Sequence, residues 1–225
     1  MVHEILLVIA ALISLSLTAL IALIVVVAYS CNLDRETSAR RFLAFIQGYR
    51  YLGRDGVVFQ RSSQCAIACY RMLLARYGIG RPKDDNLEHY LTPAGMSMLN
   101  LLKALKRAGL DVRGVRFSGL EQLTTTVVRQ QPAVVLLLSD ALLFGRLRWL
   151  FAPGWVVVRA FAWKRIQMNH WVCLDSCEPE GIVVSDPLCG RVSISAARLR
   201  RIWDGRALVA AMGGSRLQDA ATGCK

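Results

Sequence analysis

The chain has 225 residues, which is enough for one domain of ordinary size and an appendage. Its 28 Lys and Arg against 16 Asp and Glu give a formal net charge of +12, but the basic residues are scattered and accompany no nucleic-acid-binding motif, so we exclude a nucleic-acid partner. The cysteine count, seven and irregularly spaced, is typical of reduced thiols rather than of a disulfide framework.

The appendage is an apolar segment at the start of the chain. No charged residue occurs from Ile5 to Leu33, a run long enough to cross a bilayer with some tilt. The four residues before it contain no Lys or Arg, and the run is longer than the apolar part of a secretory signal peptide. We therefore predict a retained transmembrane anchor over residues 1–33.

A basic stretch follows the anchor. Five arginines lie within about twenty residues of it, at positions 35, 40, 41, 50 and 54, while none precedes it. By the positive-inside rule, we expect a single-pass protein of the inner (plasma) membrane whose main domain is cytoplasmic, with a periplasmic domain as the alternative. Residues 34–56 are interpreted as a basic juxtamembrane connector that is attracted to anionic lipids and contains a short amphipathic helix around Phe45.

The main domain is predicted over residues 57–212, and the tail, 213–225, is expected to be flexible. Apolar periodicity, capping residues and terminal glycines predict helices over Cys65–Tyr77 and Ser97–Ala108, and a third that begins with a capping box at Ser118 and Glu121. Short β-branched runs predict five strands, at Ala133–Leu138, Trp171–Leu174, Ile182–Ser185, Arg191–Ile194 and Leu208–Ala210. A fourth helix is predicted before the last strand, over Ser195–Trp203. Helices followed by an antiparallel sheet indicate an α+β fold.

Residues 139–168 do not fit a compact domain. Aromatic and aliphatic residues alternate there with Arg and Lys, as in Trp149–Phe151 and Trp163–Arg165. This pattern is typical of a membrane interface, where rings lie at headgroup level and cationic side chains extend to water. We interpret the segment as a hydrophobic and basic insertion, and an extra hairpin or helix packed on the core is the alternative.

The residues with the clearest chemical meaning surround Cys65. This cysteine opens a predicted helix, and a helix N-terminus favours the thiolate. Glutamines precede it at positions 60 and 64, and a glutamine amide near a nucleophile can donate a hydrogen bond to an oxyanion. Cys69, four residues later, is interpreted as a buried structural cysteine.

A base and a carboxylate for Cys65 are found about a hundred residues later. His170 stands at the start of an apolar strand, whereas His3 precedes the apolar run and His89 lies in a charged stretch. Asp186 ends the next strand, and a hairpin of that length returns it to the side of His170, where a carboxylate can orient the imidazole.

The ordered set of Gln60, Cys65-Ala-Ile-Ala-Cys69, His170-Trp-Val and Val184-Ser-Asp186-Pro resembles the bacteriocin-processing cysteine peptidases. The resemblance covers roughly residues 57–211. It implies a papain-like fold, cleavage of leader peptides after a double glycine, and the roles of nucleophile for Cys65, general base for His170, orienting carboxylate for Asp186 and oxyanion donor for Gln60. It implies no cofactor and no metal.

Two positions depart from this family. Glycine usually follows the nucleophile, and here the residue is Ala66. The glutamine is one residue closer to the cysteine than usual, so that either Gln60 or Gln64 could donate to the oxyanion. The expected function is membrane-anchored removal of leaders from exported precursors, with membrane lipids and a separate ABC-type exporter as partners, because the chain contains no transporter region. A catalytically silent, leader-binding adaptor is the alternative function.

A structural metal site is a further alternative. Cys65 with Cys69 and Cys173 with Cys177 share a Cys-x-x-x-Cys spacing, and His170 and Cys189 are near in sequence. The spacing differs from that of common zinc ribbons, so the peptidase interpretation is preferred.

Overall fold

The computed structural model describes residues 37–60, 64–80, 86–92, 95–130, 133–138, 145–146 and 170–212, and eight scattered residues between 9 and 20. Most of the predicted anchor (1–33) and insertion (139–168), and the whole predicted tail (213–225), lie outside these residues. Within the described part of the chain, no helix combines the length and the apolar composition that a membrane crossing requires.

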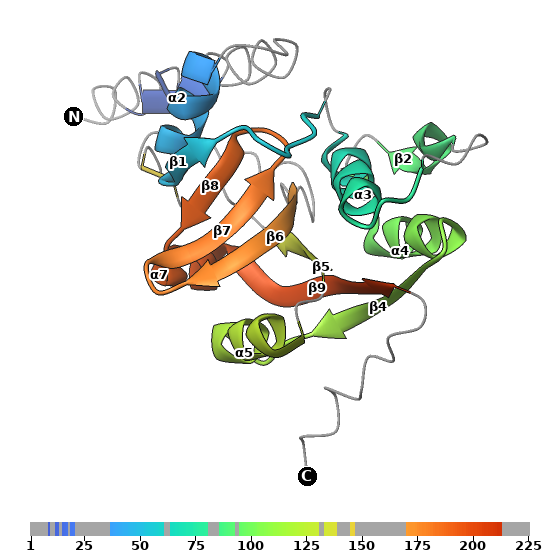
Figure 1. Ribbon diagram of the computed structural model, residues 1–225. Helices are drawn as coiled ribbons and strands as arrows, with labels where there is room; N and C mark the ends of the chain where they lie inside the picture. Colours follow the sequence, from blue (N-terminus) through green and yellow to red (C-terminus); the bar gives the residue numbers. More distant parts are fainter. Residues whose placement is uncertain are drawn as a thin grey trace.

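A seven-stranded sheet organises the domain (Figure 1). Its strand order is β1-β8-β7-β6-β5-β9-β4, and every neighbouring pair is antiparallel. The strands are β1 (Arg50–Gly53), β4 (Leu110–Arg116), β5 (Ala133–Leu138), β6 (His170–Glu178), β7 (Gly181–Asp186), β8 (Gly190–Ile194) and β9 (Trp203–Met212). A separate two-stranded ribbon pairs β2 (Leu91–Thr92) with β3 (Gly95–Met96) after a 3-10 turn, η1 (Leu87–Tyr90).

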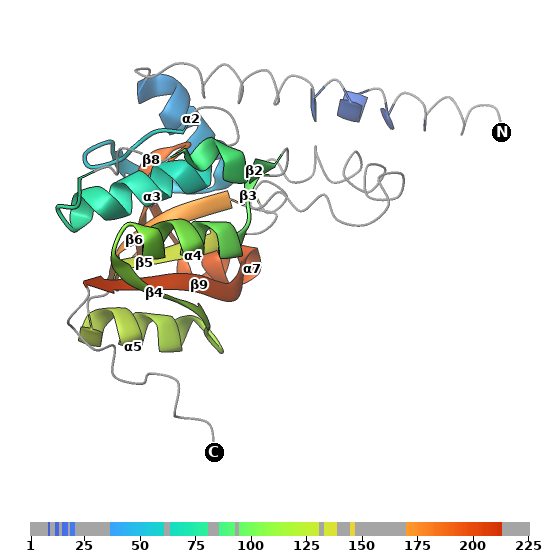
Figure 2. The same ribbon diagram turned by 90° about the vertical axis from the view of Figure 1, so that its right-hand side faces the viewer.

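Helices cover both faces of the sheet (Figures 1 and 2). One face carries α3 (Cys65–Arg76) and α4 (Met98–Arg107), and the other carries α2 (Thr37–Gln47), α5 (Leu120–Gln130) and α7 (Ala196–Ile202). Because side chains alternate along a strand, the central strands fill two cores at once. In β5, Leu136 and Leu138 face α5 and α7, whereas Val135 and Leu137 face α3 and α4.

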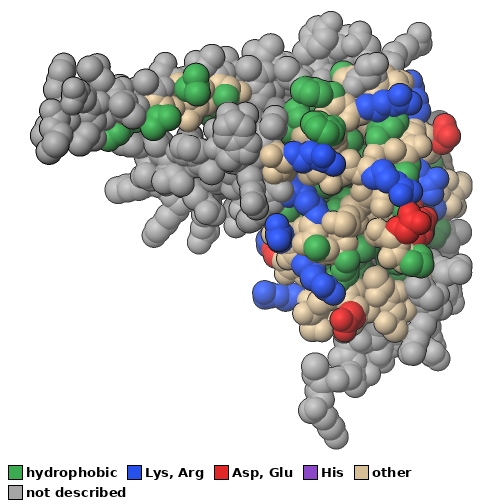
Figure 3. Space-filling model, turned by 90° about the vertical axis from the view of Figure 1, so that its left-hand side faces the viewer, with side chains coloured by type: hydrophobic (Ala, Val, Ile, Leu, Met, Phe, Trp, Pro, Cys, Tyr) green, Lys and Arg blue, Asp and Glu red, His purple; other side chains and the backbone are tan. Residues whose placement is uncertain are grey.

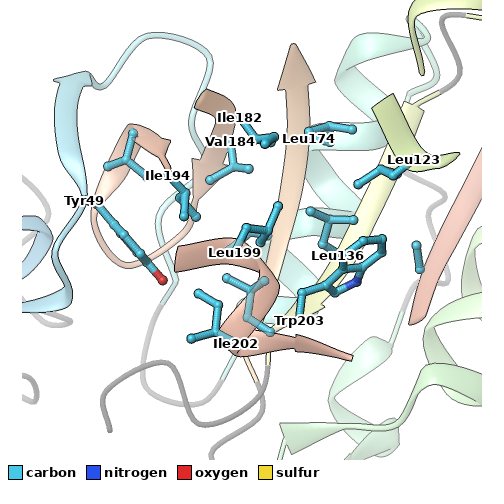
Figure 4. Close-up of a cluster of buried hydrophobic side chains, with 14 of the residues drawn as sticks. Tyr49, Leu123, Leu136, Leu174, Ile182, Val184, Ile194, Leu199, Ile202 and Trp203 are labelled. Atoms are coloured by element: carbon cyan, nitrogen blue, oxygen red, sulfur yellow. The ribbon is translucent and has the colours of Figure 1, made fainter. Parts of the chain in front are cut away.

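Both cores are apolar and closely filled, which fixes the strands that carry the site. Figure 4 shows the first of them, where Leu199 and Ile202 of α7 lie against Leu136 and Leu174 of the sheet. All four side chains are at most 2% exposed. Burying a side chain of this size contributes about 1.5–3 kcal/mol, so the sheet is a rigid platform for residues at its strand ends.

The helix predictions agree closely with the structure. The helix predicted over Cys65–Tyr77 is α3, and the left-handed Gly78 (φ 63°) follows its end. The Ser97 side chain caps α4 by accepting the N–H of Asn100, and Ser195 caps α7 in the same way through Arg198. The capping box predicted at Ser118 is wrong in its partner: Gln122, not Glu121, accepts from the Ser118 N–H at 2.8 Å.

The predicted strands are all present, and the antiparallel α+β class is confirmed. The expected division into helices first and sheet afterwards is only partly correct, because β1, β4 and β5 enter the sheet before residue 139. The strand β1 lies in the stretch interpreted as a connector, and it pairs with β8 through Arg50–Ser193 and Tyr51–Val192. Residues of the predicted connector therefore contribute an edge strand and the helix α2 to the folded unit.

Candidate active site

Cys65 is the first residue of α3. The helix forms because Ile67, Leu73 and neighbouring apolar residues pack against the sheet, and Gln64 occupies the N-cap position without a side-chain capping bond. The thiol is 7% exposed, at the end of the helix where the peptide dipoles favour a negative charge.

The helix α3 runs along β6, which sets Cys65 beside the start of that strand. The Cys173 thiol approaches the Cys69 carbonyl at 3.7 Å, one turn beyond Cys65. At the far end of the helix, Arg76 donates to the Leu174 carbonyl at 2.8 Å and pairs with Asp175 at 2.6 Å. These contacts fix the helix lengthwise, so that its first residue is held near His170.

His170, at the start of β6, and Asp186, at the end of β7, form a direct pair. The register Cys173–Ser185 of the β6–β7 hairpin brings the end of β7 close to the start of β6. His170 Nε2 lies 2.8 Å from Asp186 Oδ1, and the carboxylate is completely buried. The same oxygen accepts the backbone N–H groups of Leu188 (2.7 Å) and Cys189 (3.2 Å), which holds the carboxylate in place after the strand ends.

The Cys65 thiol and the His170 imidazole interact, and each changes the pKa of the other. Burial acts to raise the pKa of Cys65, but the hydrogen bond and charge of His170, with the N–H groups of Trp171 and Ala66, lower it overall. Burial acts to lower the pKa of His170, but the charge and hydrogen bond of Asp186 raise it well above its usual value. The arrangement therefore favours a thiolate–imidazolium pair.

Both candidate oxyanion donors lie beside the first turn of α3. Gln60 and Gln64 line the same hollow of about 370 Å³, together with Ile67 and Ala68. Gln60 is buried, and its backbone N–H donates to the Pro187 carbonyl at 3.0 Å, directly after Asp186. Gln64 is half-buried.

Ala66, where the resembling family has glycine, is fully buried and continues α3. Its backbone N–H is among the groups that lower the pKa of Cys65.

Arg40 is a residue of the site region that sequence reasoning missed. It lies on α2 and is only 2% exposed. Its Nη1 donates to the Leu188 carbonyl at 2.9 Å, and its guanidinium lies 3.5 Å from the Phe59 ring centroid. Arg40 thus holds the turn after Asp186 and the residue before Gln60. Its position could have been read from the spacing 40, 43, 44 and 47, which puts an arginine on the buried stripe of α2.

We expect Arg40→Met to lower the free energy of unfolding by about 2–3 kcal/mol, because a buried carbonyl loses a charged donor and Phe59 loses a cation. Denaturant unfolding of purified protein measures the change. Arg41→Met is the matched control, since Arg41 is exposed on the same helix and loses only a cation–π contact with Tyr51, which should cost about 0.5–1 kcal/mol. Equal stability of the two variants would contradict the role given to Arg40.

No metal centre is formed by the part of the chain that the structure describes, since it contains no group of three or more His, Cys, Asp or Glu placed to hold an ion. Cys69 and Cys173 contact each other instead, and burial, followed by the neighbouring Cys173 thiol, raises the pKa of Cys69 well above its usual value. Cys69 is therefore a protonated, packed thiol beside the reactive one.

A thiol at a helix N-terminus, a histidine that lowers its pKa and a buried carboxylate paired with that histidine are the groups that a cysteine peptidase uses. The sequence profile of the Peptidase C39 family matches residues 55–139, which include Cys65. The chain is a peptidase of the cysteine type, and its resemblance to the double-glycine leader peptidases is confirmed.

Solved structures with a similar fold include the peptidase domain of Streptococcus ComA, a bi-functional ABC transporter involved in quorum sensing (16% identity, 69% of this chain and 97% of that chain, TM-score 0.50). A double glycine motif protease from an AMS/PCAT transporter, in complex with the leader peptide, is 20% identical over 72% of this chain and 96% of that chain (TM-score 0.48). The C39-like domain of a Vibrio parahaemolyticus toxin secretion ATP-binding protein is 15% identical over 66% and 97% (TM-score 0.44). No curated protein sequence matches this chain.

Proposed function

We propose that this chain is a membrane-anchored cysteine peptidase that removes leader peptides after a double glycine from precursors of exported peptides or proteins. The observation that carries the proposal is the set of Cys65, His170 and Asp186, in which Cys65 begins α3, His170 begins β6 and Asp186 ends β7. The match to the Peptidase C39 family supports it, and the double-glycine specificity is taken from the resemblance of the sequence motifs.

In the proposed mechanism, the Cys65 thiolate attacks the carbonyl carbon of the peptide bond after the second glycine. The Cys65 backbone N–H and the Gln60 amide stabilise the oxyanion of the tetrahedral intermediate. Gln60 is preferred to Gln64 because it is more deeply buried and its backbone is fixed by Pro187.

His170 then protonates the leaving amine, which releases the mature peptide and leaves the leader as a thioester on Cys65. A water molecule, deprotonated by His170, hydrolyses the thioester and frees the enzyme. Asp186 keeps the imidazole oriented and stabilises its positive form throughout.

The proposed setting is the cytoplasmic side of the inner (plasma) membrane. The uncharged run from Ile5 to Leu33 supports an anchor, and the arginines that follow it support this orientation. An ABC-type exporter is the proposed partner, and the bi-functional transporter Streptococcus ComA is an example in which a peptidase domain of this fold belongs to an exporter.

The test is to incubate the purified full-length protein with a precursor whose leader ends in Gly-Gly and to map the cut by mass spectrometry. We expect a single cut after the second glycine. Valine in place of either glycine should reduce kcat/KM by about 100-fold or more, because a side chain at these positions blocks the entry of an extended backbone into a closed cleft. A cut elsewhere, or equal cleavage of the valine precursors, would overturn the double-glycine specificity.

A further inference from the structure

One surface of the domain combines aromatic, aliphatic and arginine side chains and is not used by the proposed chemistry. We call it the α2–β1 face and define it by six exposed or rim residues: Arg41, Phe42, Phe45, Leu52, Arg54 and Arg146. Phe42 and Phe45 are each 50% exposed and Leu52 is 39% exposed. The helix α2 thus presents large apolar groups outward, opposite its packed stripe, where a helix on a soluble domain ordinarily carries polar residues.

A hollow of about 570 Å³ lies between α2 and β1 at this face. Arg41 and Arg54 line it together with Phe45, Tyr51 and Leu52, and Asp55 is its acidic lining residue. The Arg41 guanidinium lies 5.4 Å from the Tyr51 ring centroid, and that of Arg54 lies 5.8 Å from Phe59. Two cations at the rim of an aromatic floor suit a ligand with an anionic head and an apolar body.

The two stretches that the sequence independently associates with the membrane meet at this face. Arg146 belongs to the predicted insertion, and its backbone N–H donates to the Ile46 carbonyl, at the end of α2, at 2.8 Å. Its guanidinium lies 4.5 Å from the Phe45 ring. Figure 3 shows this side of the molecule, on which Lys and Arg side chains are spread among hydrophobic ones and acidic side chains are few.

The covalent path to the apolar segment is short. That segment ends at Leu33 and α2 begins at Thr37, so the connection spans at most about 14 Å when fully extended. If the segment is an anchor, α2 cannot leave the membrane surface by more than this distance. This step rests on the proposed function, whereas the charge and exposure of the face do not.

We propose that the α2–β1 face lies flat on a bilayer, with Phe42, Phe45 and Leu52 at headgroup level and with Arg41 and Arg54 holding the phosphate of an anionic phospholipid over the hollow. Aromatic and aliphatic side chains flanked by cations are the composition that interfacial helices use. Positive charge complements the anionic cytoplasmic leaflet. The site would thereby be held at a fixed orientation to the membrane from which its precursors leave.

The test uses the full-length protein with Phe45→Trp as a fluorescent reporter and vesicles whose lipids carry bromine on the acyl chains near the headgroup. The parent protein gives the background from its own tryptophans. Leu99→Trp is the matched control reporter, because Leu99 is 58% exposed on α4, which covers the other face of the sheet. We expect bromine to quench the fluorescence of the Phe45→Trp reporter strongly in vesicles that contain phosphatidylglycerol and more weakly in vesicles of phosphatidylcholine alone. The Leu99→Trp reporter should be quenched in neither kind of vesicle.

The charge requirement is tested by adding Arg41→Gln and Arg54→Gln to the reporter. Removing two cations is expected to shift docking about 30-fold toward the undocked state, seen as loss of the phosphatidylglycerol-dependent quenching. Arg113→Gln with Arg116→Gln is the control, because it removes the same charge from β4, at the opposite edge of the sheet. Equal quenching in both lipids, equal quenching of both reporters, or equal effects of the two charge pairs would overturn the proposal. So would a signal from the Phe45→Trp reporter that answers to a leader peptide and not to lipid.

The anchor and the docking of the α2–β1 face are tested separately, by vesicle sedimentation and by quenching. Sedimentation with phosphatidylcholine vesicles reports the anchor, because it needs no surface charge. A protein that sediments only with phosphatidylglycerol vesicles, in a salt-sensitive way and with quenching of the Phe45→Trp reporter, would lack the anchor and still support the face. A protein that sediments with both but shows no lipid-dependent quenching would keep the anchor and refute the face.

Discussion

Cys65→Ala is expected to abolish processing of a Gly-Gly precursor, with a loss of at least about 10³- to 10⁴-fold in kcat/KM, because no thioester can form without the thiol. The expectation rests on the Cys65 thiol, whose pKa is raised by burial but lowered overall by His170 and by the backbone N–H groups of Trp171 and Ala66. The measurement is the rate of mature peptide formation followed by mass spectrometry, with variant and parent at equal concentration.

The control for this experiment is Cys69→Ala. Cys69 lies one turn further along the same helix, is completely buried and has a raised pKa, so it should be inert as a nucleophile. Its loss removes a single sulfur from the core and should leave most of the activity. If Cys65→Ala processed the precursor as fast as the parent, the peptidase mechanism would fail. A parent protein that bound the leader without cutting it would instead be the silent adaptor.

Asp186→Asn is expected to reduce kcat/KM by on the order of 10²- to 10³-fold and to move the alkaline limb of its pH profile to lower pH. The active thiolate–imidazolium pair exists above the pKa of Cys65 and below that of His170. Burial alone would lower the pKa of His170, and Asp186 provides the main opposing interactions. Without that charge, the imidazolium loses its proton at a lower pH, so the alkaline limb shifts downward.

The same pKa shift has a consequence for stability with a definite sign. A histidine whose folded pKa is raised stabilises the fold fully below its unfolded pKa, and this contribution is lost as the pH rises through the folded pKa. Asp186→Asn should therefore cost most stability at acidic pH, where His170 is charged. Asp175→Asn is the matched control, because Asp175 lies on the strand β6 and pairs with Arg76 and Arg191 rather than with His170. If the alkaline limb of the pH profile were unchanged in Asp186→Asn, Asp186 would not have the proposed role of orienting and charging His170.

Residues that lie close along helices and hairpins could be predicted from the sequence. The stripe of apolar residues after Cys65 and the stop at Gly78 define α3, and the length of the β6–β7 hairpin is enough to place Asp186 beside His170. The pairing of Cys65 with His170 could be proposed because the chain has so few histidines, but their contact depends on α3 lying along β6, which is a tertiary arrangement.

The strands that were missed are those whose local signals are weakest. The strand β1 has four residues and lies at the edge of the sheet, so it carries little apolar pattern. In β4, Leu110 and Val112 alternate inward, but Gly114 and the arginines at 113 and 116 obscure the pattern. Arg40 was missed for another reason: its partners, Phe59 and the Leu188 carbonyl, lie 19 and 148 residues away, and only packing brings them together.

The pairing of β1 with β8 determines where a recombinant fragment can begin without loss of a strand from the sheet. A recombinant fragment begun at residue 57, the boundary that the sequence suggests for the catalytic domain, would lack both β1 and α2. The strand β8 would then become an edge strand with unpaired backbone groups, and such strands promote aggregation by pairing with another chain. The turn that carries Asp186 would lose Arg40 as well. The smallest fragment fit for crystallisation or inhibitor screening thus begins before Thr37, within a few residues of the apolar segment.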